Sequence, residues 1–585
     1  MQKTSLIFVA AALAALLTPI VEANSEGHGE VIYPSRCNAF LHFRSIDGTC
    51  NNLRNPTWGA AYEPYRRLAG HNYGDGISSL PTASDGAELP TARLVSLAVG
   101  SLPNSSPASR SFLHVLFGFF LALDVTATPL LADADGQPTS CCPKFSNAHR
   151  GQTHPDCASV ILSATGPSFS ELEQRCMEFL RSAPAAKCES GGSKDTLTQF
   201  TRNNCAPWRV LPRPEGSVNA ATAYLDASMV YGSARRTRST DDGHVTDENV
   251  FNRYQFLYAP DVWPLVNMFY RMVTRYHNNV ADRLKEINVD WDGERLFQET
   301  RRIVVAQLQH VVYNEYLPKI LGPDAMNKYE LTPLTGSERR EDYDASENAA
   351  TSSEFETAAL RFSQSQRPES IEFANGEVTE VELSSPTLAE SLEHTPSQVL
   401  RAVSRQAASK VVFAKELYFG IDLLARSIQR GRDHGLGGYA AVRAARDNTE
   451  INTFDDLTES LGQDVSNNLK TVYNDVRDID LLIGGAFEQP VPDGVLGPTF
   501  TSVLAEQFSR ILKADRYWYE TNIKETRFKD DQLEALHSTT LAAIMCDAFP
   551  ELEEIQERPF EVVSAENKLV PCNGVPPVGL EAWKP

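Results

Sequence analysis

Two short stretches of the sequence contain candidate functional residues, and the first is TAYLDASMVYGS at positions 222–233. Four residues with oxygen ligands stand there at alternate positions: Thr222, Tyr224, Asp226 and Ser228. In an extended segment all four would point to one side. Gathered hydroxyl, carbonyl and carboxylate oxygens suit Ca²⁺. The alternative is a half-buried strand that runs into a Tyr-Gly turn and binds no metal. The stretch alone does not decide between the two, because a calcium site also needs a carboxylate from elsewhere in the chain.

The second stretch is QRGRDHGLGGY at positions 429–439. His434 could act as an acid or a base with Asp433 beside it. The same residues, together with Arg430 and Arg432, could instead form a buried network of charges that satisfy one another. We favour the network, because such networks perturb pKa values without any catalysis.

The elements that must position these stretches are predicted to be helices. In residues 295–322 the apolar side chains recur near helical spacing, and Pro318 and Gly322 mark the exit of that helix. Residues 266–287 and 540–549 show the same pattern, whereas strand signals are few and short. The sequence therefore predicts a mainly α fold with few short strands, in one large domain or in two to three smaller ones. Two polar, acidic interruptions are expected to be surface loops, at 336–353 and 374–398.

The net charge and the N-terminal residues bear on the partners and the location of the protein. The chain has 54 basic and 76 acidic residues and a net charge of −22, which argues against nucleic acid or an anionic membrane as partner. Lys3 precedes an apolar run at 6–17, with small residues suited to cleavage after Ala23. We expect a signal peptide at 1–23, a mature domain at 24–585 and a secreted protein. The run is short for a membrane anchor.

An oxidising compartment would make the 10 cysteines disulfide partners rather than zinc ligands. Cys37 and Cys50 bracket a short loop, and Cys546 and Cys572 form a second close pair. The six cysteines between 141 and 205 allow several pairings, which stay open. Asn104 begins an acceptor sequence for N-glycosylation, which fits a secreted glycoprotein.

Four blocks together make the chain resemble the animal haem peroxidase family, in an invertebrate, peroxinectin-like version. The resemblance implies a mostly α-helical domain with haem in its core, a calcium site beside the haem, and oxidation of donors by hydrogen peroxide. The blocks occur in the order of that family and span nearly the whole chain from Cys37 onward. They are DGTCNNLRNPTWGAAYEPYRRL, TAYLDASMVYGS, WDGERLFQETRRIVVAQLQHVVYNEYLPKILG and RGRDHGLGGY.

The resemblance places the iron ligand of the family at Gln364. The family pattern is about Ala-Phe-Arg-Phe-Gly-His, and residues 359–364 here read ALRFSQ. Glutamine is not among the usual axial ligands of haem iron. The asparagine that orients the proximal histidine in the family is replaced by Ser427. A helix through this stretch is expected to bury Phe355, Ala358, Ala359 and Phe362 on one stripe and to leave Thr357, Leu360 and Gln364 on another.

The distal residues of the family are replaced as well. Its pattern of about Trp-Gly-Gln-Phe-Leu-Asp-His-Asp corresponds to FGFFLALD at 117–124. Phe119 replaces the glutamine, Ala122 a haem-linking aspartate, and Leu123 the histidine that moves the peroxide proton. An ungapped match through the following helix puts Ala259 at the distal arginine and Val262 at the second haem-linking carboxylate. His310 and His434 have family counterparts, but the resemblance makes neither an iron ligand.

Asp124 is retained, and in the family this carboxylate is a calcium ligand. It supplies the remote carboxylate that the first stretch needs, so the resemblance implies one calcium site. Its ligands would be Asp124, Thr222, Tyr224, Asp226 and Ser228.

The losses are selective, because the polar haem contacts are replaced while the calcium ligands, cysteines and scaffold remain. We therefore expect a secreted, calcium-stabilised and catalytically inactive peroxidase homologue without haem. It would bind an extracellular protein or matrix partner that the sequence does not identify, since no RGD or KGD tripeptide is present. The alternatives are an active haem peroxidase with substitute residues, and a non-catalytic carrier of haem or an apolar ligand.

Overall fold

The structure is a computed structural model that describes most of the chain from Cys37 to Pro585. The predicted signal peptide, Asn104, Cys205, Ala259 and Val262 lie outside the described residues. The described ranges are 37–100, 107–131, 141–142, 154, 156–162, 176–184, 186–188, 208–210, 216–233, 240–246, 263–368, 370–374, 378–382, 396–409 and 422–585.

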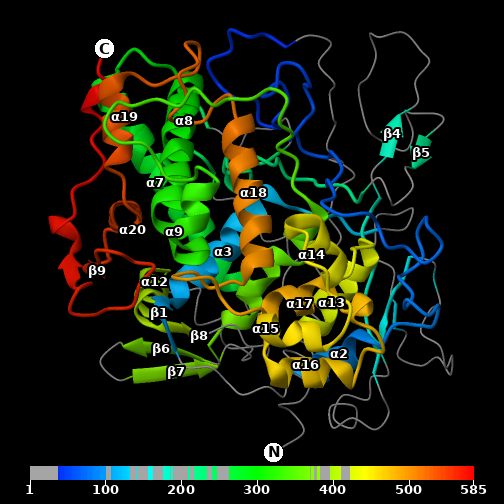
Figure 1. Ribbon diagram of the computed structural model, residues 1–585. Helices are drawn as coiled ribbons and strands as arrows, with labels where there is room; N and C mark the ends of the chain where they lie inside the picture. Colours follow the sequence, from blue (N-terminus) through cyan, green and yellow to red (C-terminus); the bar gives the residue numbers. More distant parts are fainter. Residues whose placement is uncertain are drawn as a thin grey trace, which may run out of the picture.

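Long helices around a buried central helix form the core, and the predicted mainly α fold is confirmed (Figure 1). The central helix is α3 (Phe112–Val125), and all of its residues are buried. Its sequence is apolar on every face, as expected of a helix with no solvent side. α3 packs against α7 (Trp263–Ile287), α12 (Pro396–Arg405) and the 3₁₀ helix η3 (Ala359–Gln366).

The remaining helices cover this centre. They are α2 (Ala92–Val99), α5 (Ser228–Tyr231), α8 (Gly293–Val311), α9 (Pro318–Lys328), α10 (Ser353–Thr357), α13 (Leu423–Asp433), α14 (Tyr439–Asp447), α15 (Thr458–Leu461), α16 (Gln463–Lys470), α17 (Leu481–Phe487), α18 (Pro498–Ala514), α19 (Asp530–His537) and α20 (Leu541–Ala548). Short 3₁₀ turns occur at η4 (Asp455–Leu457), η5 (Val476–Asp478), η6 (Cys572–Gly574) and η7 (Glu581–Trp583). α7 and α20 confirm two of the helices predicted from periodicity.

The strands in the described part of the chain are short and form two-stranded antiparallel sheets. The longest ladder places Ile371 opposite Val381, and its second strand lies inside the stretch at 374–398 that we predicted to be a loop. The pairs are β1 (Pro107–Ser111) with β8 (Ala407–Ser409), β2 (Val160–Ile161) with β3 (Cys176–Met177), β4 (Ala186–Cys188) with β5 (Trp208–Val210), β6 (Ser370–Ala374) with β7 (Val378–Glu382), and β9 (Glu554–Gln556) with β10 (Leu569–Pro571).

The helix predicted at 295–322 is divided into three parts. α8 ends at Val311, a π-helical turn η2 (Val312–Tyr316) follows, and α9 begins at Pro318. Pro318 therefore opens a helix, as prolines do at the first helical position, instead of marking an exit. Gly322 kinks α9 with a φ of 73°, a conformation that glycine adopts at little steric cost.

Four disulfides join described cysteines, which confirms the expectation of disulfide bonding. They resolve part of the pairing that the sequence left open, and no cysteine in the described part of the chain is free. Among the described helices, none is both long and apolar enough to cross a membrane. The disulfides are Cys37–Cys50, Cys141–Cys157, Cys142–Cys176 and Cys546–Cys572.

Candidate functional site

The segment that carries Gln364 is not the continuous helix expected from the sequence. α10 ends at Thr357, Ala358 leaves helical geometry with φ −126° and ψ −67°, and η3 follows. A local reason for this break is that Arg361 Nε donates to the Glu356 carbonyl oxygen at 3.0 Å. The side chain thus occupies an acceptor that a backbone N–H would use in a longer helix. The change of helix type alters the faces, and Thr357 and Leu360 are buried together with the predicted apolar stripe.

Gln364 is half-buried and turned toward α13. Its side-chain oxygen lies 2.8 Å from the Ser427 hydroxyl, which also lies 2.9 Å from the Leu423 carbonyl oxygen. The two residues that the resemblance assigns to the iron ligand and its orienting partner are therefore in contact. Their interaction is a neutral hydrogen bond, and the Gln364 amide oxygen is engaged in it.

The opposite side of this position is closed by α3. Phe119, Ala122 and Leu123 are 3%, 6% and 0% exposed, and they belong to the same apolar cluster as Phe355 and Phe362. The space left between α3 and η3 is a cavity of about 10 Å³. A cavity needs ~10–15 Å³ to hold a single water molecule. The packed residues therefore do not fit a haem in this arrangement.

An ion pair that the sequence analysis missed lines the same cavity. Arg361 and Glu356 are in contact, and their side chains are only 9% and 3% exposed. Burial by itself would raise the pKa of Glu356, but the charges of Arg361, His434 and Arg430, together with the hydrogen bond from Arg361, outweigh it and hold that pKa below its usual value. A buried carboxylate and a buried guanidinium thus neutralise each other at the edge of the cavity between α3 and η3. The sequence signal was a glutamate and an arginine five residues apart in an apolar stretch.

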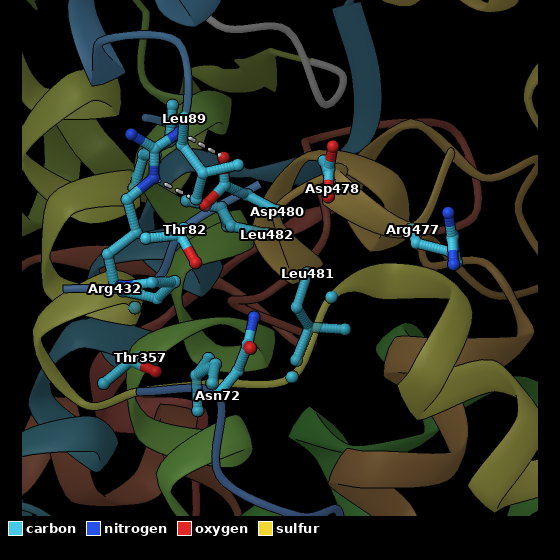
Figure 2. Close-up of a pocket in the computed structure, with 16 residues that line it drawn as sticks. Asn72, Thr82, Leu89, Thr357, Arg432, Arg477, Asp478, Asp480, Leu481 and Leu482 are labelled. Atoms are coloured by element: carbon cyan, nitrogen blue, oxygen red, sulfur yellow. Dashed lines mark hydrogen bonds and ion pairs between the residues drawn. The ribbon is translucent and has the colours of Figure 1, made fainter. Parts of the chain in front are cut away.

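The second candidate stretch, at 429–439, forms the buried charge network that we favoured. Asp433 accepts from Arg181 Nε at 2.7 Å and from the Ser182 hydroxyl at 2.6 Å. Arg432 donates to both oxygens of Asp480 at 2.9 and 2.8 Å (Figure 2).

Beside Arg432 lies a cavity of about 30 Å³ that reaches Thr357 of α10 (Figure 2). His434 is fully buried, and burial lowers its pKa to about 4. Neither of its ring nitrogens has a hydrogen-bond partner among the described residues. The alternative that we did not favour, acid–base use of His434 with Asp433, finds no support in this geometry.

The first candidate stretch folds as a loop rather than as an extended strand. Ala227 adopts a left-handed conformation with a φ of 55°, and α5 begins at the next residue. This turn, not strand alternation, brings the oxygen atoms together. The Thr222 hydroxyl donates to Asp226 Oδ1 at 2.8 Å, and the Ser228 backbone N–H donates to the same atom at 3.1 Å.

The last turn of α3 brings Asp124 to this loop. Asp124 Oδ2 accepts from the Ala227 N–H at 3.2 Å, and the Ser228 hydroxyl donates to the Asp124 carbonyl oxygen at 2.7 Å. The Tyr224 carbonyl oxygen lies 3.4 Å from the Thr222 hydroxyl, whereas the Tyr224 phenol turns away to the Trp58 carbonyl oxygen. All five residues predicted as calcium ligands therefore lie together, and the Tyr224 atom that faces the others is its carbonyl oxygen.

Electrostatics fit a cation at this cluster. Asp124 and Asp226 are 5% and 0% exposed. Burial and the neighbouring Asp226 raise the pKa of Asp124 to about 7, and burial raises the pKa of Asp226. Asp226 Oδ2 has no hydrogen-bond partner among the described residues. A divalent cation would let both carboxylates stay ionised.

The rest of the donor set must be neutral oxygens. No group of three or more His, Cys, Asp or Glu side chains in the described ranges could hold a metal, so this site would combine two carboxylates with hydroxyl and carbonyl oxygens. Arg301, which the sequence analysis missed, is buried nearby and donates to the Arg44 and Ser45 carbonyl oxygens at 3.1 and 3.2 Å. The charges of Arg44 and Arg301 partly offset that of Asp226. Mixed oxygen ligands of this kind are those that Ca²⁺ accepts.

Comparisons with known proteins agree with this architecture. The chorion peroxidase of Drosophila melanogaster is 30% identical, in an alignment that covers 93% of this chain and 71% of that protein. A Drosophila melanogaster protein named peroxidase is 28% identical over 92% of this chain and 82% of that protein. The structure of peroxidase A from Dictyostelium discoideum superposes with a TM-score of 0.66 at 22% identity, covering 89% of this chain and 100% of that chain, which shows the shared fold.

The family description "animal haem peroxidase" matches residues 43–560. This range includes α3, the loop at 222–228, η3 and α13. These elements build the closed position between α3 and η3 and the cluster around Asp124 and Asp226. The chain belongs to the animal haem peroxidase family.

Proposed function

We propose that this member of the family is a pseudo-peroxidase that binds no haem and acts as a secreted binding or structural protein. The observation that carries the proposal is the packing between α3 and η3, where Phe119, Leu123 and Leu360 are buried and a cavity of about 10 Å³ remains. Peroxidase chemistry needs a proximal ligand, which is usually histidine, and a distal base. Gln364 and Leu123 supply neither.

The retained cluster of Asp124 and Asp226 would hold calcium as a structural ion. The calcium ion would supply positive charge between two buried carboxylates and would connect the end of α3 to the loop that precedes α5. Thr222 and Ser228 would orient the carboxylates through the hydrogen bonds described above. This role needs no redox chemistry, so it can persist in a protein without haem.

Secretion is part of the proposal and rests on the leader-like residues 1–23 and on the disulfides. Expression in a secretory cell followed by N-terminal sequencing of the medium tests it. We expect a mature protein that begins at Asn24. A protein retained in the cell with Met1 in place would contradict it.

Haem titration tests the loss of function. Purified protein expressed with excess hemin is expected to show no Soret band and no peroxide-dependent oxidation of guaiacol. A stoichiometric Soret band without turnover would indicate the haem carrier instead. A Soret band with turnover would indicate an active peroxidase and end the proposal.

A further inference from the structure

A groove remote from the closed haem position has a charge opposite to that of the whole chain. Its volume is about 470 Å³, within the range of ~300–1,000 Å³ typical of ligand pockets. It lies where the α7–α8 connection meets the start of α19 and residues 583–585, beside α19 and the C-terminal end in the upper left of Figure 1. A second hollow of about 530 Å³ shares His42, Arg295 and Glu299 with it.

Five Lys and Arg side chains line this groove against two acidic side chains, Asp290 and Glu299, although the chain carries a net charge of −22. A local excess of positive charge in an acidic protein attracts anionic ligands selectively, because the rest of the surface repels them. The cations are Arg295, Arg302, Arg527, Lys529 and Lys584.

Three of these cations are exposed and available to a ligand: Arg295, Arg527 and Lys529. Within the described ranges none of the three forms an ion pair. Arg295 lies over the ring of Trp291 at 4.5 Å, and Arg527 donates to the Asn522 side-chain oxygen at 3.0 Å.

The other two cations are already engaged. Arg302 donates to the Thr526 carbonyl oxygen at 2.8 Å, and Lys584 pairs with Glu581. The groove therefore offers two guanidinium groups and one ammonium group to carboxylates.

Apolar side chains lie among these cations. Val289 is 81% exposed, and Ile287 and Trp583 line the same groove. Arginine and tryptophan beside aliphatic surface are the composition of protein-binding hot spots. A sulfated glycan would satisfy the cations but has no aliphatic side chain for Val289 and Ile287.

We propose that this groove binds an acidic peptide segment of a partner protein, with carboxylates on Arg295, Arg527 and Lys529 and an apolar side chain against Val289. This assignment stands whether or not the chain binds haem, because the groove shares no lining residue with the cavity between α3 and η3.

The test uses the full-length secreted protein and a fluorescein-labelled peptide of Glu and Asp around a central Leu, with fluorescence polarisation at an ionic strength of about 0.15 M, where the Debye length is about 8 Å. Arg527→Glu combined with Lys529→Glu is expected to weaken binding about tenfold or more, because reversed charges repel the ligand. The control is Lys470→Glu, which reverses one exposed charge on α16 at the bottom of Figure 1 and is therefore matched in charge to the single groove variant Arg295→Glu. It should change the dissociation constant less than about twofold, since charges beyond about a Debye length are screened.

Arg295→Glu reverses a charge on α8 and gives an independent variant if the double variant does not fold. A peptide with Gly in place of the central Leu should bind more weakly, and equal binding would remove the apolar contact. The proposal is overturned if the wild-type protein does not bind the acidic peptide, or if Lys470→Glu weakens binding as much as the groove variants do. Tighter binding of a heparin fragment, lost in the same groove variants, would make the groove a glycan site instead.

Discussion

Removing the carboxylate of Glu356 should destabilise the protein strongly, although no ligand is involved. Glu356 and Arg361 are 3% and 9% exposed in their side chains, and Arg430 and His434 also act on Glu356 electrostatically. Glu356→Gln leaves the Arg361 guanidinium buried without its counter-charge. Breaking a buried ion pair from one side costs about 3–5 kcal/mol. We therefore expect Glu356→Gln to lower the free energy of unfolding by about that amount.

The assay is urea denaturation of wild type, Glu356→Gln, Arg361→Met and the double variant. The double variant should recover much of the loss, since replacing both partners of a buried pair by neutral groups is often close to neutral. A coupling free energy between the two sites therefore distinguishes the ion pair from general damage to the core. If Glu356→Gln is as stable as wild type to within about 0.5 kcal/mol, as expected of an exposed pair, the reasoning is refuted.

Three further predictions follow from the same site. The folded-state pKa of Glu356 lies below its unfolded value, so its stabilisation is present at neutral pH and is lost as the pH falls through the folded pKa; wild type should lose more stability than Glu356→Gln between pH 5 and about pH 3, measured by urea midpoints. Chelation of calcium should lower the melting temperature, and Asp226→Ala should lower it by itself and make it insensitive to the chelator; a melting curve unchanged by both would remove the calcium site. Leu123→Ala removes a fully buried side chain from α3 and should cost about 2–5 kcal/mol in the free energy of unfolding, whereas an unchanged value would indicate an open pocket.

The elements predicted well from sequence are those whose pattern is local. The periodic residues at 266–287 lie in α7, and those at 540–549 lie in and beside α20. Thr222, Tyr224, Asp226 and Ser228 were selected by residue type and spacing and Asp124 by the family resemblance, and the structure places these five residues together. The expected extended conformation of this stretch was wrong, because a left-handed turn at Ala227 stands in place of the strand.

Features that depend on particular side-chain contacts, whether local or between distant residues, were not predicted from the sequence. The break between α10 and η3 accompanies a bond from the Arg361 side chain to a backbone carbonyl, which periodicity does not reveal. The basic groove joins residues near 290, 527 and 584, and the overall charge of −22 conceals it. Only packing in three dimensions shows how little space Phe119 and Leu123 leave beside η3.

The most direct test of the closed haem position is a hemin titration of the single variant Gln364→His, followed by its absorbance spectrum. The variant supplies an imidazole at the family's ligand position but leaves Phe119 and Leu123 in place, and displacing packed core side chains costs about 1–3 kcal/mol or more. A melting curve checks that the variant is folded. We predict no Soret band and no saturable uptake of hemin. Tight uptake with the spectrum of a histidine-ligated haem would contradict the account, because the pocket would then be open and only its ligand lost.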